Sequence, residues 1–520
     1  MTSFITNYYR TGRFLNSKRR KLRFYIFLIL SIIFPFSLFS QEIPTENTSV
    51  DYRLETRGSV AYQSITPFWI HNNSEGIIPL DANFALLLAN ASGTHRLNKN
   101  TWIEAGLSIV GETTGIADSI GTSRAGAFLQ QWYAAIAYRA LKLSVGARPI
   151  NHSILDRSLS SGDLVFSPNA RPFPEINLSI PEFVTVPFTK NYLQFKGDFA
   201  LGKFMDDAYT RDVKAPNAAY AQNILIHHKS VFFSIREPSG KIPLQLIFGV
   251  EHSVQYGGSK SNTGPLPQSF SDFLRVVVGS GGGEDAPFGE QVNRLGNHLG
   301  TYSLRLGYTF PFAEFAVYKQ HYFEDNSGME YANWRDGIWG FEWTFFKQTY
   351  LKKFVFEYIQ TMNQSGPFLF PEFHKVFPEG MKARIGGGDN YYNHGIYSSG
   401  WSYFGHAIGN PLVTSPEYNQ DGTLGFKDNR IKAWHGGFQG NILPELSYRI
   451  LGTASYGYGT MGKPFLERKY GLSGLLECNY SFPNGKGWEV GIQLGADKGT
   501  LYENNIGGLL RIAKTGTIIK

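Results

Sequence analysis

The sequence predicts an all-β fold, a transmembrane antiparallel β-barrel of about 18 strands with long, partly helical loop inserts. Alternating apolar and polar residues recur along the whole chain, and this two-residue period is typical of strands with one face in an apolar environment. Aromatic residues make up 15% of the chain and glycines number 57, which favours strands and turns over helices. The pattern follows an N-terminus that is first basic and then apolar, as in an export signal.

That N-terminus predicts a signal peptide over residues 1–40. A basic run ends at Arg23, and an apolar run of 16 residues follows over residues 24–39. A spanning helix needs roughly 20 apolar residues, so this run is too short for an anchor, and we expect cleavage near Ser40. No other apolar run reaches the length of a spanning helix, so membrane insertion would have to use strands.

The formal charge of +7 does not indicate a nucleic-acid partner. Residues 1–40 carry seven basic residues and no acidic one. Removing those seven from the 49 basic residues leaves 42, which equals the 42 acidic residues, so the mature chain would be neutral. The single cysteine, Cys478, allows no internal disulfide and no thiolate metal site.

A hairpin in the middle of the chain has the clearest strand pattern. Between Leu299 and Phe310, apolar residues alternate with serine, arginine, glycine and threonine. Pro311 ends this strand, and a second strand over residues 313–323 follows after a very short turn. The same pattern predicts further strands at residues 54–63, 83–90, 102–111, 128–138, 141–147, 192–201, 222–236, 244–255, 338–346, 354–362, 431–442, 446–458, 472–482, 488–497 and 506–512.

Parity completes the strand count. The patterns give about seventeen strands, whereas a bacterial barrel has an even number, with both chain ends and the short turns on the periplasmic side. The tight turns near Asn98 and Pro444 fall on that side together only if one more strand lies between them. We place this strand within residues 148–189, at residues 175–180.

Three long inserts interrupt the strands, at residues 148–189, 256–297 and 364–429. By parity, the second and third inserts lie on the outer side of the barrel. The second contains an amphipathic helix, which a glycine run at residues 281–283 would end. Its apolar residues are Phe270, Phe273, Leu274, Val277 and Val278. The expected organisation is a signal peptide over residues 1–40, a flexible segment over residues 41–52 and the barrel over residues 53–520.

Several stretches resemble the capsule assembly protein Wzi family, whose members are outer-membrane barrels. They occur in the same order over most of the chain, at residues 66–71 (TPFWIH), 160–163 (SSGD), 169–174 (NARPFP), 228–229 (HK), 255–258 (QYGG), 270–275 and 293–302 (NRLGNHLGTY). The resemblance implies a barrel of about 18 strands whose inserts occlude the lumen. It also implies a lectin-like role, in which the protein holds exported capsular polysaccharide at the surface of a Gram-negative cell.

Candidate polysaccharide-binding residues gather in the third insert and in a neighbouring loop. Aromatic rings can stack on sugar faces, and amides and carboxylates can bind hydroxyl groups. Arginines would suit an acidic polymer. The candidates are Tyr331, Trp334, Arg335, Arg384, Tyr391, Tyr392, Trp401, Tyr403, His406 and Asn410. The alternative is that the aromatic residues pack the loops shut over the lumen.

A segment of the third insert nearly fits a calcium loop. Glu417, Asn419, Asp421 and Asp428 stand at ligand positions, and Gly422 stands at the position of the sharp turn. The first ligand is glutamate instead of aspartate and no helices flank the loop, so a polar turn is the alternative. We expect no cofactor.

Signatures of an enzyme are missing from the sequence, which has no HExxH motif, no CxxC pair and no nucleophile elbow. Residues 457–463 resemble a phosphate-binding loop, but Pro464 stands where serine or threonine should bind the metal. Ser398 and Ser399 near His394 form the one cluster that could suggest a hydrolase. We therefore expect a non-enzymatic, monomeric protein whose partners are surface polysaccharide and outer-membrane lipid. The alternatives are an outer-membrane porin or transport channel and an outer-membrane hydrolase.

Overall fold

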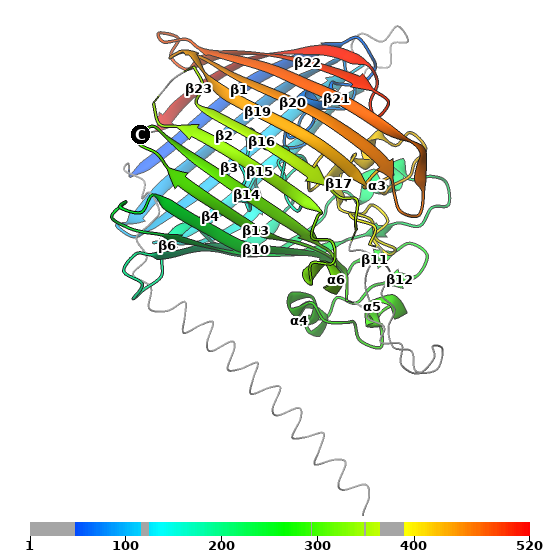
Figure 1. The fold of residues 1–520 in the computed structure, drawn as a ribbon. Coiled ribbons are helices and arrows are strands. Elements are labelled where there is room, and N and C mark those ends of the chain that lie inside the picture. The colour runs from blue at the N-terminus through cyan, green and yellow to red at the C-terminus, as the bar shows by residue number, and fades with distance from the viewer. Residues whose placement is uncertain (1–46, 116–123, 293, 348–349, 365–388, 520) are drawn as a thin grey trace, which may run out of the picture.

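The barrel is a single closed antiparallel sheet of 18 strands, as the sequence predicts (Figure 1). The computed structural model describes residues 47–115, 124–292, 294–347, 350–364 and 389–519, so the expected signal peptide lies outside it. The first strand bonds to both the second and the last, which closes the barrel and leaves no free edge. The barrel strands are β1 (Thr48–Ala61), β2 (Phe84–Asn98), β3 (Thr101–Thr114), β4 (Arg124–Tyr138), β5 (Leu141–Ala147), β6 (Glu175–Thr185), β7 (Leu193–Lys203), β9 (Leu225–Arg236), β10 (Leu244–Tyr256), β13 (Asn297–Thr309), β14 (Ala313–Phe323), β15 (Gly337–Phe345), β16 (Lys353–Gln360), β19 (Ile431–Leu443), β20 (Leu446–Gly459), β21 (Pro464–Ser481), β22 (Trp488–Gly499) and β23 (Asn505–Ile519).

The two faces of the barrel wall differ in the way the alternating pattern predicts. On β13, Leu304 and Leu306 point outwards and are about half exposed. Arg305, between them, points into the barrel and donates to Glu342 on β15 at 3.0 Å. An apolar outer face combined with paired charges on the inner face is typical of a transmembrane barrel.

The two ends of the barrel are different (Figure 1). One end carries the short turns. It also carries the start of the first strand and the finish of the last, since Val50 of β1 pairs with Ile519 of β23. The other end, here called the loop end, carries the long loops and their small elements. These elements are α2 (Phe68–His71), α3 (Asp207–Val213), α4 (Phe270–Val278), α5 (Phe288–Val292), α6 (Asn326–Met329), the 3₁₀ helix η1 (Pro416–Tyr418), β8 (Ala221–Gln222), β11 (Ser259–Lys260), β12 (Gly264–Pro265), β17 (Ser402–Tyr403) and β18 (His406–Ala407). No helix among the described residues is long and apolar enough to cross a membrane.

Three loop segments fill the lumen, at residues 62–83, 148–174 and 389–430. Their buried side chains form one hydrophobic core with inward-facing residues of the wall. Polar contacts fix two of them to strands: Trp69 Nε1 donates to Thr453 Oγ1 at 3.0 Å, and the Ser161 amide donates to Glu357 Oε2 at 2.8 Å. Parts of the first and third inserts therefore occlude the lumen, as expected, together with residues 62–83, which were not predicted as an insert.

The predicted strands are confirmed, and the strand placed by parity is β6. Several boundaries were wrong, and β2 and β23 run to Asn98 and Ile519, beyond their predicted ends at residues 90 and 512. β1 begins at Thr48, inside the segment expected to be flexible, and β21 begins at Pro464, before the predicted start at residue 472. At strand ends beyond the apolar region, backbone pairing continues although the side chains no longer alternate, so the sequence pattern stops too early.

The predicted amphipathic helix is α4. Ser269 caps its N-terminus by accepting from the Asp272 amide, and the Asp272 carboxylate accepts from the Ser269 amide in return. The helix ends at Gly279, which adopts a left-handed conformation with φ of 63°. The glycine run at residues 281–283, expected to end it, therefore lies beyond the helix.

Candidate functional site

A polar pocket of about 590 Å³, here called the loop pocket, lies among the loops at the loop end of the barrel. Its walls come from the segment around α5, the start of β13, the loop after β14 and the third insert. The polar residues that line it are Glu290, Arg294, Asn297, His298, Glu324, Asp325, Asp389, Asn390, Asn393 and His394. Carboxyl and amide groups at this density can bind several hydroxyl groups of a sugar at once.

Burial changes the charge of the loop pocket. It raises the pKa of Glu290 to about 7, and burial together with the neighbouring Asp389 carboxylate raises the pKa of Glu324 well above its ordinary value. Burial lowers the pKa of His394 to about 4, so this ring is neutral at neutral pH. The pocket is therefore less negative than its number of carboxyl groups suggests, and its protonated carboxyl groups can donate hydrogen bonds as well as accept them.

An aromatic rim lies beside the loop pocket and is defined by Tyr302, Tyr331 and Trp334. Tyr331 stacks on Tyr302 with ring centroids 5.6 Å apart, and it is 52% exposed. Trp334 is 56% exposed, and the Arg335 guanidinium lies 5.3 Å from its ring centroid. Arg294 of the loop pocket donates from Nη2 to the Met329 sulfur at 3.5 Å, and Met329 lies just before Tyr331 in the loop after β14. Three predicted binding residues, Tyr331, Trp334 and Arg335, thus lie together and accessible.

The other described candidates are buried in the core that fills the lumen. These are Tyr391, Tyr392, Trp401, Tyr403, His406 and Asn410. Trp401 Nε1 donates to the Val165 carbonyl at 2.7 Å, and Asn410 Nδ2 donates to Ser161 Oγ at 3.0 Å. Neither ring faces nor amides of this group are open to a ligand in this arrangement, which fits the alternative that they pack the loops together. Arg384 lies outside the described residues.

The predicted calcium ligands do not converge. Asp421 pairs with Lys427 at 2.7 Å on the surface, and Asn419 donates to the Thr423 and Gly425 carbonyls. Asp428 accepts from the backbone amides of Tyr458 and Gly459, and Glu417 points towards two histidines. Each side chain of the polar turn has another partner in this structure, so these residues are not brought together as ligands of one ion.

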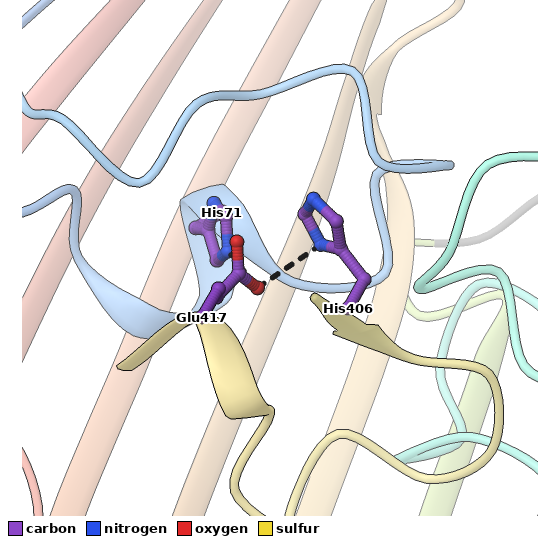
Figure 2. A group of neighbouring side chains, drawn as sticks. All are labelled: His71, His406 and Glu417. Carbon is purple, nitrogen blue, oxygen red and sulfur yellow. Dashed lines mark hydrogen bonds and ion pairs between the residues drawn. The ribbon is translucent and has the colours of Figure 1, made fainter. Parts of the chain in front are cut away.

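Glu417 belongs instead to a buried group with His71 and His406 (Figure 2). Glu417 Oε1 lies 2.9 Å from His71 Nε2 and 3.1 Å from His406 Nδ1. Burial acts to lower the pKa of His71, but the Glu417 carboxylate raises it above its ordinary value. Burial also lowers the pKa of His406, to about 4. Burial acts to raise the pKa of Glu417, but the two histidines lower it.

A second group of this kind lies on the wall and an adjoining loop. Asp198 Oδ2 on β7 lies 3.2 Å from His152 Nδ1 and 3.3 Å from His228 Nε2 on β9. Asn177 Nδ2 also donates to Asp198 Oδ2 at 3.2 Å, and the Ser230 hydroxyl donates to Asp198 Oδ1. The carboxylate is thus already well bonded within the barrel.

Sequence reasoning missed the loop pocket and both His–carboxylate groups. The residues of the loop pocket come from four separate segments, so no local pattern marks them. Two signals were present: the stretch at residues 293–302 contains Arg294, Asn297 and His298, and the stretch at residues 66–71 ends on His71. Both stretches were recognised as part of a resemblance and not as ligand-binding residues.

Comparisons with known proteins agree with the barrel fold. A family model described as capsule assembly protein Wzi matches residues 47–417. Wzi of Escherichia coli, described as an outer membrane protein involved in group 1 capsule assembly and a carbohydrate-binding β-barrel, shares 14% identity, covering 89% of this chain and 83% of that chain, with a TM-score of 0.50. OccK5 (OpdH) of Pseudomonas aeruginosa shares 9% identity, covering 91% of this chain and 99% of that chain, with a TM-score of 0.44. No curated protein matches.

Proposed function

Because the chain belongs to the capsule assembly protein Wzi family, we propose that it is a non-enzymatic outer-membrane protein that attaches exported capsular polysaccharide to the cell surface. Its Escherichia coli relative is described as a carbohydrate-binding barrel. Residues 1–40 would direct export, and the apolar outer face of the barrel would contact the lipid of the outer membrane.

The observation that carries the proposal is the position of the loop pocket and the aromatic rim. Both lie at the loop end, where a polymer can reach them without entering the barrel. The pocket supplies carboxyl and amide groups for hydroxyls, and Tyr331 and Trp334 supply accessible rings for sugar faces. Arg335 adds a positive charge for an acidic residue of the polymer. Glu290 and Glu324 would act as hydrogen-bond partners in this site and not as catalysts.

A transport channel is the alternative function of the same architecture. Barrels of 16–18 strands usually enclose an aqueous channel. In this chain three loop segments occupy that space, and their polar contacts with Thr453 and Glu357 hold them to the wall. This favours attachment over transport.

Binding of purified protein to capsular polysaccharide tests the proposal. We expect Tyr331→Ala and Trp334→Ala each to weaken binding by roughly 10- to 30-fold, the range for the loss of a well-placed aromatic contact. Calorimetry in detergent would measure the dissociation constants. Phe188→Ala is the control, because Phe188 is a fully exposed aromatic residue in the short turn between β6 and β7, at the opposite end. Equal affinity of all four proteins would contradict the proposed surface.

A further inference from the structure

Three side chains from distant parts of the chain meet between the loops that fill the lumen, away from the loop pocket (Figure 2). His71 ends α2, His406 begins β18 and Glu417 lies in η1. Their Nε2, Nδ1 and carboxylate oxygen atoms all lie within 4.8 Å of one another. Two imidazoles and one carboxylate form a set of metal ligands that proteins commonly use.

The orientation of His71 is fixed by the backbone. Its Nδ1 lies 2.9 Å from the Ile78 carbonyl, which only accepts, so Nδ1 must carry the hydrogen. In the neutral ring, Nε2 then has a lone pair, and this lone pair faces Glu417 Oε1 at 2.9 Å. Two acceptors at this distance require a cation between them, either a proton or a metal. Donation of the other ring N–H to a backbone carbonyl is also what metal-bound histidines usually show.

His406 provides an independent observation. Its side chain is buried, and its Nδ1 has no hydrogen-bond partner among the described residues. Nδ1 nevertheless lies 3.1 Å from the same Glu417 oxygen without the geometry of a hydrogen bond. A buried nitrogen of this kind needs a partner, and a metal bound by the other two groups would supply it.

Gly405 helps to bring Glu417 close to His406. Its φ is +81°, and an added Cβ would lie 2.1 Å from the Tyr209 hydroxyl and 3.0 Å from the Glu417 Cβ. The Glu417 amide also donates to the Gly405 carbonyl at 3.1 Å. The backbone therefore holds the carboxylate beside the imidazole independently of the side chains.

We propose that His71 Nε2, His406 Nδ1 and Glu417 form a structural site for a divalent transition metal of the zinc class, which joins residues 62–83 to the third insert inside the lumen. Zinc bonds of about 2.0–2.1 Å in a tetrahedral arrangement separate ligand atoms by about 3.3 Å. Glu417 Oε1 lies 2.9 and 3.1 Å from the two imidazole nitrogens, close to that value. Calcium does not suit this set, because it takes six to eight oxygen ligands. The site does not depend on polysaccharide binding.

The second His–carboxylate group also has buried nitrogens without a hydrogen-bond partner among the described residues, His152 Nδ1 and His228 Nε2, but it differs in its carboxylate and in its tautomers. Asp198 already accepts from Asn177 and from the Ser230 hydroxyl. His228 Nδ1 bonds to the Ser253 hydroxyl, which can donate or accept, so the tautomer of this ring is not fixed. The two groups therefore serve as site and matched control in one protein.

Zinc binding to the intact, detergent-purified barrel tests the proposal. After removal of metals with a chelator, we expect the parent chain to bind one Zn²⁺ at the His71 group in a calorimetric titration. His71→Ala, His406→Ala and Glu417→Gln should each weaken that binding by more than about tenfold, since even loss of a supporting partner costs about 10- to 100-fold. His152→Ala and His228→Ala should leave it unchanged. Co²⁺ should give the strong visible absorption of a tetrahedral site in the parent chain.

Two results would overturn the inference. One is the absence of zinc binding and of the tetrahedral Co²⁺ spectrum in the parent chain, a measurement that requires no variant to fold. A proton shared by His71 and Glu417 would then explain the geometry. The other is zinc binding that survives His406→Ala and is lost in His228→Ala, which would move the site to the Asp198 group.

Discussion

At the scale of single residues, we expect Asp428 to make stability depend on pH. It lies in the loop before β19, where Oδ1 accepts from the Tyr458 and Gly459 amides at 3.0 and 2.8 Å. Burial raises the pKa of Asp428 from 3.8 to about 7. Because the folded pKa exceeds the unfolded one, the folded state binds the proton more tightly, and the free energy of unfolding falls as the pH rises from about 4 to about 7.

Asp428→Asn should remove this pH dependence. The amide keeps an oxygen for both backbone donors but cannot ionise, so we expect the variant to be more stable than the parent chain at pH 8 and similar at pH 4. The difference should be a few kcal/mol, at about 1.4 kcal/mol per unit of pKa difference. Thermal unfolding at the two pH values measures it. Asp421→Asn is the control, since its exposed ion pair with Lys427 contributes only about 0–1 kcal/mol. Parallel pH profiles of the parent chain and Asp428→Asn would refute the assignment.

The sequence indicates which residue types could bind polysaccharide, but it does not predict which of them are exposed. Tyr331, Trp334 and Trp401 were all aromatic candidates in loops. The first two are exposed at the loop end, whereas Trp401 is fully buried and bonds to Val165, more than 200 residues earlier in the chain. A side chain's environment depends on such distant contacts, which no local pattern records. The His–carboxylate group of His71, His406 and Glu417 was missed for the same reason.

At the scale of elements, Glu357 of β16 anchors the loop segment at residues 148–174. It is fully buried and accepts from the Ser160 hydroxyl, the Ser161 amide and the Tyr318 hydroxyl at 2.6, 2.8 and 2.7 Å. Glu357→Ala leaves three buried donors without this acceptor, at a cost of about 1–3 kcal/mol each before the structure adjusts. We expect faster amide hydrogen exchange at Ser161 and its neighbours.

Glu489→Ala is the control for this prediction. Glu489 lies on β22 and pairs with Arg511 of the adjacent β23 and with Arg53 of β1, the strand beyond it, so its partners all belong to the barrel wall. Its loss should leave exchange in residues 148–174 unchanged. The anchoring role of Glu357 would be refuted by equal exchange rates at Ser161 in the two variants.

Elements with a clear residue period were predicted well, whereas several strand boundaries were not. The hairpin of β13 and β14 was identified from its two-residue period, and β6 from the even number of strands that a barrel requires. The early start of β1 at Thr48 was missed, because its first residues are held by backbone bonds to β2 and β23 and not by an apolar face. Parity is a property of the closed sheet, so it located a strand that local sequence could not.

At the scale of the whole molecule, the filled lumen separates this barrel from an open porin. The resemblance of the sequence implied this occlusion, but only the structure assigns it to residues 62–83, 148–174 and 389–430. In planar bilayers we expect the protein to lack the stable conductance steps of an open barrel with 16–18 strands. An open porin of that size, measured in the same bilayers, is the control. Porin-like steps from the parent chain would support transport instead.

The proposed attachment role is tested most directly by measuring cell-bound and released capsular polysaccharide in a strain that lacks this protein. We predict a normal total yield of polymer with most of it in the medium, because synthesis and export continue while attachment is lost. A copy of the parent gene should return the polymer to the cells, and a copy with Tyr331→Ala and Trp334→Ala should not. Polymer that remains on cells lacking the protein would contradict the account.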